Sequence, residues 1–368
     1  MHERPSLATV AREWGRIGCI GFGGPPAHIA LLRSLCVDRR RWIEPHEFED
    51  AIAACNLLPG PASTQLAIFC AWRLRGRTGA VVGGVAFIVP GLVLILLLSA
   101  LFLAGSPPRW VRGAGAGAGA AVAAVALQAG LTLLPDSRRR AESVARWLAY
   151  LAAGGVAAAT IGPWLVLVLL GCGALELGLR RTRGNNLLSV AALPALVWVA
   201  FKVGALSYGG GFVIVPLMQG DAVGHYHWMS SGQFLNAVAL GQVTPGPVVQ
   251  TVAAVGYAAA GLAGGLLAAL VAFAPSFAFI LLGAGRFGQL RANRDARAFL
   301  GGAGPAAVGA IIGVAVPLAR ALSEPWQYGV LAGAAVVLVV LRRGVVPTLV
   351  LAGAVGAGLA LAGGKLPH

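Results

Sequence analysis

Residues 56–65 read NLLPGPASTQ, and residues 242–251 read QVTPGPVVQT. Each stretch carries a Pro-Gly-Pro triplet inside a long apolar run. Proline ends a helix because it lacks an N–H and its ring clashes with the preceding turn, yet it suits the first turn of the next helix. The glycine between the prolines permits a sharp change of direction. Each triplet therefore predicts a tight corner between two helices.

The two corners belong to a larger internal repeat. A shift of 186 residues places the second half of the chain on the first without a gap over much of its length. The predicted repeats, residues 1–183 and 187–368, form an arrangement typical of transporters. Besides the corners, the shift pairs Gly18 with Gly204, Gly23 with Gly209, Gly24 with Gly210, Phe48 with Phe234 and Gly79 with Gly265.

Composition places the chain in a membrane. Of its 368 residues, 58% are apolar and only 11% are charged, whereas soluble domains carry about 25% charged residues. The apolar runs 79–104 and 113–134 are long enough to cross a bilayer as helices. They lack the two-residue alternation of outer-membrane barrels. We therefore predict an all-α polytopic membrane protein surrounded by lipid, and we exclude soluble enzymes and nucleic-acid binders; we expect no catalytic activity, metal or cofactor.

The basic residues predict how the halves are oriented. The net charge of +15 resides largely in short loops between apolar runs, which is the pattern of the positive-inside rule. The basic loops 33–41 and 73–77 correspond to the stretches 219–232 and 259–263, which lack Lys and Arg, whereas 286–297 is more basic than its counterpart. Because the charges change sides between the halves, we predict that the repeats have inverted topology.

An inverted duplication requires an odd number of crossings in each half. Each half contains six apolar runs, so one run must turn back. Basic residues flank both ends of 47–73, and neutral residues flank both ends of 233–258. We therefore predict re-entrant hairpins there, with tips near the bilayer midplane and about ten crossings overall. The alternative, in which 7–35 is re-entrant and 47–73 spans, stays open.

A second duplicated motif interrupts the first apolar run of each half. Residues 18–26 read GCIGFGGPP, and residues 204–212 read GALSYGGGF. A broken helix at membrane depth persists only where protein buries it or where it lines a wet cavity. The second half-helix would begin near Pro26 and leave the amides of Ala27 and His28 free. Helix starts carry partial positive charge and bind anions.

The corners and the breaks together predict an anion site. We expect free amides at 62–64 and 248–250, and two aligned cations, of which Lys202 lies in an apolar stretch where a bare charge costs upward of about 2.5 kcal/mol. Polar side chains at the corners either bind the anion or satisfy the broken backbone. Gln65, Gln250 and Thr251 extend this polar set, and the acids Glu176 and Asp221 are candidate proton carriers without an evident partner. The predicted anion-binding residues are Arg16, Gly23, Gly24, Asn56, Pro59, Gly60, Pro61, Ser63, Thr64, Lys202, Ser207, Gly209, Gly210, Gln242, Thr244, Pro245, Gly246 and Pro247.

These motifs resemble one known family. GFGGPPAHIALL at 21–32 and SYGGGFVIVPL at 207–217, each followed by its Pro-Gly-Pro segment, are similar to the chromate transporter superfamily in its bidomain form. The resemblance covers nearly the entire chain. It implies a multi-pass carrier in the bacterial inner membrane that exports chromate and confers resistance, with sulfate as a related oxyanion.

The residues themselves favour a site for a compact dianion, because helix starts and cations converge with few acids. Export of each negative charge against an inside-negative potential is favourable by about 2.3 kcal/mol per 100 mV, and we expect alternating access around fixed hairpin tips. The competing hypotheses are a sulfate or other anion carrier, an anion channel, and an accessory scaffold. A homodimer is also an open expectation.

Overall fold

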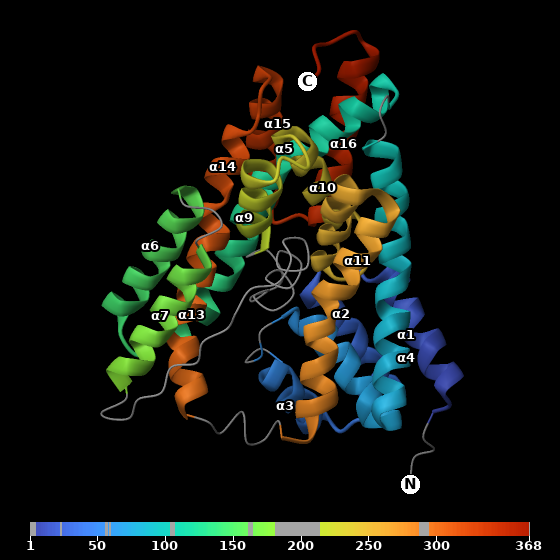
Figure 1. Ribbon diagram of the computed structural model, residues 1–368, viewed down its shortest axis with the longest axis vertical. Helices are drawn as coiled ribbons and strands as arrows, with labels where there is room; N and C mark the ends of the chain where they lie inside the picture. Colours follow the sequence, from blue (N-terminus) through green and yellow to red (C-terminus); the bar gives the residue numbers. More distant parts are fainter. Residues whose placement is uncertain are drawn as a thin grey trace.

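The computed structural model describes residues 5–22, 24–55, 58, 60–103, 107–160, 165–180, 214–286 and 294–367 (Figure 1). Within these ranges the chain is helical and contains no strand. Four helices are long and apolar enough to cross a membrane, and three shorter apolar helices accompany them. The predicted all-α polytopic membrane protein is therefore confirmed, while the count of ten crossings stays a prediction.

The elements follow one another in a similar order in the two halves. The first half contains α1 (Leu7–Ile20), α2 (Pro25–Arg33), the π-helix η1 (Ser34–Arg39), α3 (Pro45–Cys55), α4 (Ala62–Phe102), α5 (Arg109–Arg139), α6 (Val144–Thr160) and α7 (Leu165–Arg180). The second half contains α9 (Ile214–Gln219), η3 (Gly220–His225), α10 (Ser231–Val243), η4 (Val248–Gln250), α11 (Thr251–Gly283), η5 (Ala284–Arg286), α13 (Arg294–Gly313), α14 (Ala315–Arg320), α15 (Pro325–Ala335), η6 (Val336–Val340) and α16 (Val345–Leu361).

Helix α4 folds back on itself. At Gly76 the backbone has φ 62°, a conformation that glycine adopts without strain. Beyond this turn Gly79 lies against Ala71, and Gly84 lies against Ile68, contacts that a straight helix does not allow. A short arm before Gly76 and a long arm up to Phe102 therefore form a tight antiparallel pair.

Helix α11 turns in the same way at Gly261, where φ is 60°. Gly264 lies against Gly256, and Gly265 lies against Ala253. The turn follows that of α4 by 185 residues rather than 186, so the second half is one residue shorter between its corner and its turn. The interior prolines, Pro90 and Pro275, keep this spacing.

The segment that contains the first corner is a re-entrant hairpin, as the charge pattern predicts. Glu47, in the first turn of α3, forms an ion pair with Arg73, near the end of the short arm of α4. The chain between them passes through the Pro-Gly-Pro corner. Both outer ends of this hairpin thus lie on one face of the molecule, and the corner lies inside it.

The first apolar run also turns back, which differs from the expectation that 7–35 crosses the bilayer. The end of η1 returns to α1, because the Arg40 guanidinium lies 3.4 Å from the Glu13 carboxylate. Arg33 at the end of α2 likewise lies 3.3 Å from Glu49 in α3. The physical reason is the break at 21–24, where the chain reverses before Pro25 restarts the helix. Both early segments of this half are therefore re-entrant.

The long arms of α4 and α11 cross the core side by side and antiparallel. Gly84 packs against Phe277 toward one end, and Leu96 packs against Gly265 toward the other. Between these contacts, Gly91 meets the carbonyl oxygen of Pro245. The second corner therefore lies about halfway along the long arm of α4.

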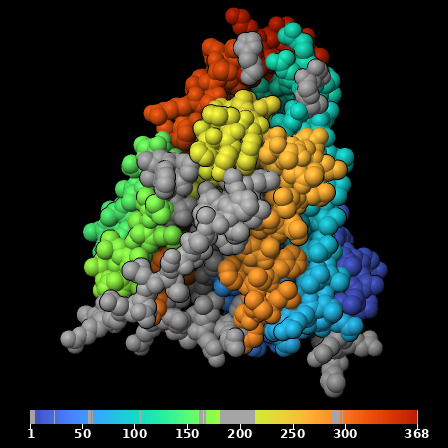
Figure 2. All heavy atoms as spheres, in the orientation of Figure 1, coloured from blue at the N-terminus to red at the C-terminus, as the bar shows by residue number. Residues whose placement is uncertain are grey.

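The outer helices pack on the other half of the chain. α5 packs against α15 and α16, and α13 packs against α6 and α7. Glycines make these contacts close: Gly117 lies against the backbone of Ala352, and Gly154 lies against that of Ala306. Small residues of this kind let membrane helices approach closely. On the face shown in Figure 2, α6 and α7 lie to one side in green and α11 to the other in orange.

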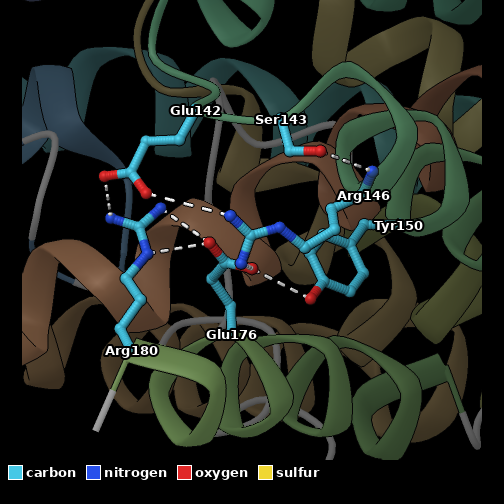
Figure 3. A network of polar contacts seen from close by, with 6 residues as sticks. All are labelled: Glu142, Ser143, Arg146, Tyr150, Glu176 and Arg180. Atoms are coloured by element: carbon cyan, nitrogen blue, oxygen red, sulfur yellow. Dashed lines mark hydrogen bonds and ion pairs between the residues drawn. The ribbon is translucent and has the colours of Figure 1, made fainter.

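A polar network fastens α6 to α7 (Figure 3). Glu176, which is only 3% exposed, accepts hydrogen bonds from Arg146 at 3.1 Å and from Tyr150 at 3.0 Å, and pairs with Arg180 at 2.7 Å. Glu142 contacts both arginines. The sequence expectation that Glu176 has no partner is therefore wrong. The carboxylate is held by two cations, so it serves to fix these helices.

We expect Gly154→Val to destabilise the fold, because a side chain there would collide with the Ala306 backbone. Overpacking of this kind costs about 1–3 kcal/mol, and the thermal unfolding midpoint in detergent should fall by several degrees. Gly171→Val in α7 is the matched control, since nothing lies within 4 Å of that position. Equal midpoints for the two variants would contradict the packing of α6 on α13.

Candidate functional site

Both Pro-Gly-Pro corners require their glycine. The φ angle is 117° at Gly60 and 99° at Gly246, values that residues with a Cβ rarely adopt. Pro61 then caps α4, and Pro247 caps η4. The corners predicted from the sequence are therefore present in both halves.

The corner of the second half touches the break in the first. The N–H of Gly246 donates a hydrogen bond to the carbonyl oxygen of Gly21 at 3.0 Å. Gly24, at the other end of this break, faces Val248, the first residue of the returning arm. Two interruptions that lie more than two hundred residues apart in the sequence are thus joined by a direct backbone hydrogen bond.

His28 connects this junction to the first corner. Its Nε2 lies 2.8 Å from the same Gly21 oxygen, and its Nδ1 lies 3.2 Å from Oγ of Ser63, just past the corner. The ring is fully buried and meets Phe87 edge-on at 5.1 Å. The break of the first half and both corners therefore form one continuous set of contacts inside the molecule.

Fewer amides are free at the helix starts than the sequence indicates. The amide of Thr64 donates to Pro61 at 2.9 Å, that of Gln250 donates to Pro247 at 2.9 Å, and that of His28 donates to Gly24 at 3.2 Å. The expectation that these three amides point into the site is wrong, because the capping carbonyl already accepts a bond from the residue three or four places ahead. The earlier amides of Ala62 and Ser63 remain candidates.

Several buried polar side chains at the corners have unsatisfied atoms. Among the described residues, no hydrogen bond reaches Oγ1 of Thr64 at the first corner, or Nε2 of Gln242 and Oγ1 of Thr244 at the second. All three residues are buried, and an unpaired buried polar group costs about 1–3 kcal/mol. Their gathering at the two corners indicates a place for a polar ligand.

Other polar residues of the set do satisfy the broken backbone. Nε2 of Gln250 donates to the Ile88 carbonyl at 2.8 Å, and Oγ1 of Thr251 donates to the Val248 carbonyl at 2.8 Å. Both roles proposed for these side chains therefore occur. Oε1 of Gln250 still has no partner among the described residues.

A cavity of about 110 Å³ reaches the first corner. Gly60 and Ala62 line it, opposite Asp136 and Arg140 of α5 and Pro305 of α13. A water needs about 10–15 Å³ of such space, so the cavity holds several waters. A second cavity, of about 560 Å³, lies at the beginnings of α5, α10 and α15.

Arg16 does not lie among these contacts. Its side chain is 52% exposed on α1 and is 3.9 Å from Glu13, which Arg12 and Arg40 also approach. Its role as an anion contact stays a prediction. The structure places Gly24, Gly60, Pro61, Ser63, Thr64, Gln242, Thr244, Pro245, Gly246 and Pro247 at or beside the two corners. Gly23, Asn56, Pro59, Lys202, Ser207, Gly209 and Gly210 lie outside the described residues.

Sequence reasoning missed the imidazole of His28, for which only the backbone amide was considered. The available signal is a histidine in an otherwise apolar segment directly after a break. Among the described residues, no group of three histidine, cysteine or acidic side chains is placed to hold a metal ion.

The chain matches the family described as chromate transporter over residues 8–177 and 194–359. It is 32% identical to the chromate transport protein of Cupriavidus metallidurans over 87% of this chain and 85% of the relative. It is 30% identical to the chromate transport protein of Pseudomonas aeruginosa over 84% of this chain and 80% of the relative. No solved structure matches the chain. With the family match covering nearly all of both halves, the chain belongs to the chromate transporter family.

Proposed function

We propose that this protein carries chromate out of the cell across the bacterial inner membrane. The observation that carries the proposal is the meeting of both Pro-Gly-Pro corners and the glycine break through Gly21 and His28. The named relatives support chromate as the transported anion.

The chemistry of the junction suits a compact oxyanion. The stretches 24–28, 60–65 and 242–251 contain no Asp or Glu, and α2 and α4 begin there. Partial positive charge at helix starts attracts anions, and the unpaired hydroxyl and amide groups of Thr64, Thr244 and Gln242 can donate to oxygen. Sulfate has the same shape and charge, so we expect it to compete.

We further propose that residues 1–183 and 187–368 are inverted repeats. Two observations support this. The π-helices η1 and η3 occupy equivalent positions at a shift of 186, and the long arms of α4 and α11 run antiparallel across the core. In an inverted pair, each half contributes a re-entrant corner from its own face of the membrane.

Alternating access follows from this arrangement. We propose that α5 with α15 and α16, and α13 with α6 and α7, rock around the joined corners, while the cavity beside Gly60 opens toward the face that carries Arg140. An inside-negative potential favours exit of each negative charge by about 2.3 kcal/mol per 100 mV. Arg16 and Lys202 stay proposed anion contacts, and a homodimer stays a proposal.

Vesicles containing the purified protein should take up chromate with saturation, faster when the vesicle interior is positive, and sulfate should compete. Radioactive or colorimetric chromate uptake under an imposed potassium diffusion potential measures this. A conductance that does not saturate would indicate an anion channel instead, and absence of flux would indicate an accessory scaffold.

We expect Thr244→Val to raise the KM for chromate about tenfold or more, because a hydrogen bond to a charged ligand contributes about 1.5–3 kcal/mol. Without anion, the variant should be at least as stable as the wild type, since an unpaired hydroxyl is removed. Ser99→Ala is the control, as Ser99 is also buried and unpaired but lies two turns beyond Gly91 on α4. Equal KM values for the two variants would place the anion elsewhere.

Inverted topology predicts opposite labelling at the two helical turns. In a chain without native cysteines, Thr78→Cys should react with an impermeant maleimide only after cells are opened, and Leu262→Cys should react in intact cells. Both positions are exposed. Labelling of both from the same side would contradict the inversion.

A further inference from the structure

The His28–Ser63 pair has no counterpart in the second half of the chain. A shift of 186 residues places Ile214 at the position of His28 and Val249 at that of Ser63. Both of these apolar side chains are fully buried. The fold therefore accepts two apolar residues at these positions, and packing alone does not explain a buried polar pair in the first half.

The contacts of His28 define its protonation state. The Gly21 carbonyl can only accept, so Nε2 of His28 must carry a hydrogen. In the neutral ring Nδ1 is then an acceptor, and the Ser63 hydroxyl donates to it. The hydrogen of Ser63 is thus committed to the imidazole and does not point toward a ligand at the corner.

No charged side chain of the described residues contacts the imidazole. On its own helix α2 the charged residue is Arg33, which pairs with Glu49. On α1 it is Glu13 with its arginines, and on the short arm of α4 it is Arg73 with Glu47. A proton on His28 would create a buried cation without a counter-ion, which is costly.

Resting on the proposed transport of chromate, we propose that His28 takes up a proton when an anion binds at the corners, so that proton and anion binding are linked. The proton comes from water and adds to Nδ1, which then donates to Oγ of Ser63. The Ser63 hydrogen is released and turns toward the anion. The anion supplies the missing counter-charge, and by linkage each ligand raises the affinity for the other.

The test compares chromate uptake by wild type and His28→Gln in vesicles at about pH 6 and pH 8, the range in which histidine changes charge. Glutamine can donate to Gly21 and accept from Ser63 but does not titrate. Chromate itself takes up a proton in this range, so the ratio of the two KM values is compared. We expect the wild-type KM to rise with pH relative to the variant, by about tenfold per pH unit at most. His46→Gln, on the exposed first turn of α3, should behave as the wild type.

A ratio that does not change with pH overturns the proposal. If His28→Gln fails to fold, the wild type provides the second measurement. At about pH 8, where free chromate carries no proton, its binding should remove protons from a weakly buffered dye solution. Chromate binding without proton uptake overturns the linkage, whereas absence of chromate binding at either pH refutes the proposed function itself.

Discussion

The carbonyl oxygen of Gly21 holds the centre of this molecule together. It accepts one hydrogen bond from the Gly246 amide and one from the His28 ring. A carbonyl exposed by a helix break at membrane depth has no water to bond, and leaving it unpaired costs several kcal/mol. The chain meets this requirement by bringing the corner of one half to the break of the other. The same contacts that satisfy the backbone therefore fix both corners about halfway along the long arm of α4.

The remaining packing follows from that requirement. Glycines at 84, 91 and 265 let the long arms of α4 and α11 lie close to each other and to the Pro245 carbonyl. The outer helices then exchange partners, with α5 on α15 and α16, and α13 on α6 and α7. Polar side chains that would be unfavourable in a dry core, such as Thr64 and Thr244, are retained at the corners. Their placement is what an anion passing through the junction would need.

Much of this arrangement was predictable from residue chemistry. The two Pro-Gly-Pro triplets predict the corners, and the arginines around 47–73 predict that the first corner hairpin returns to its own face, as the Glu47–Arg73 pair confirms. The return of α2 toward α1 was not predicted, because a run of 29 apolar-rich residues from 7 to 35 is long enough to cross, and only the ion pair of Glu13 with Arg40 reveals its direction. The partners of His28 and Glu176 depend on tertiary contacts between helices far apart in the sequence, and no local pattern specifies them.

The central claim is that the anion binds where the two corners meet. Anomalous scattering from chromium in crystals grown with chromate tests it most directly. The account predicts a chromium peak within hydrogen-bonding reach of the chain at Ser63 and at the Gly246 corner. A peak confined to the surface arginines around Glu13, with none between the corners, would contradict it.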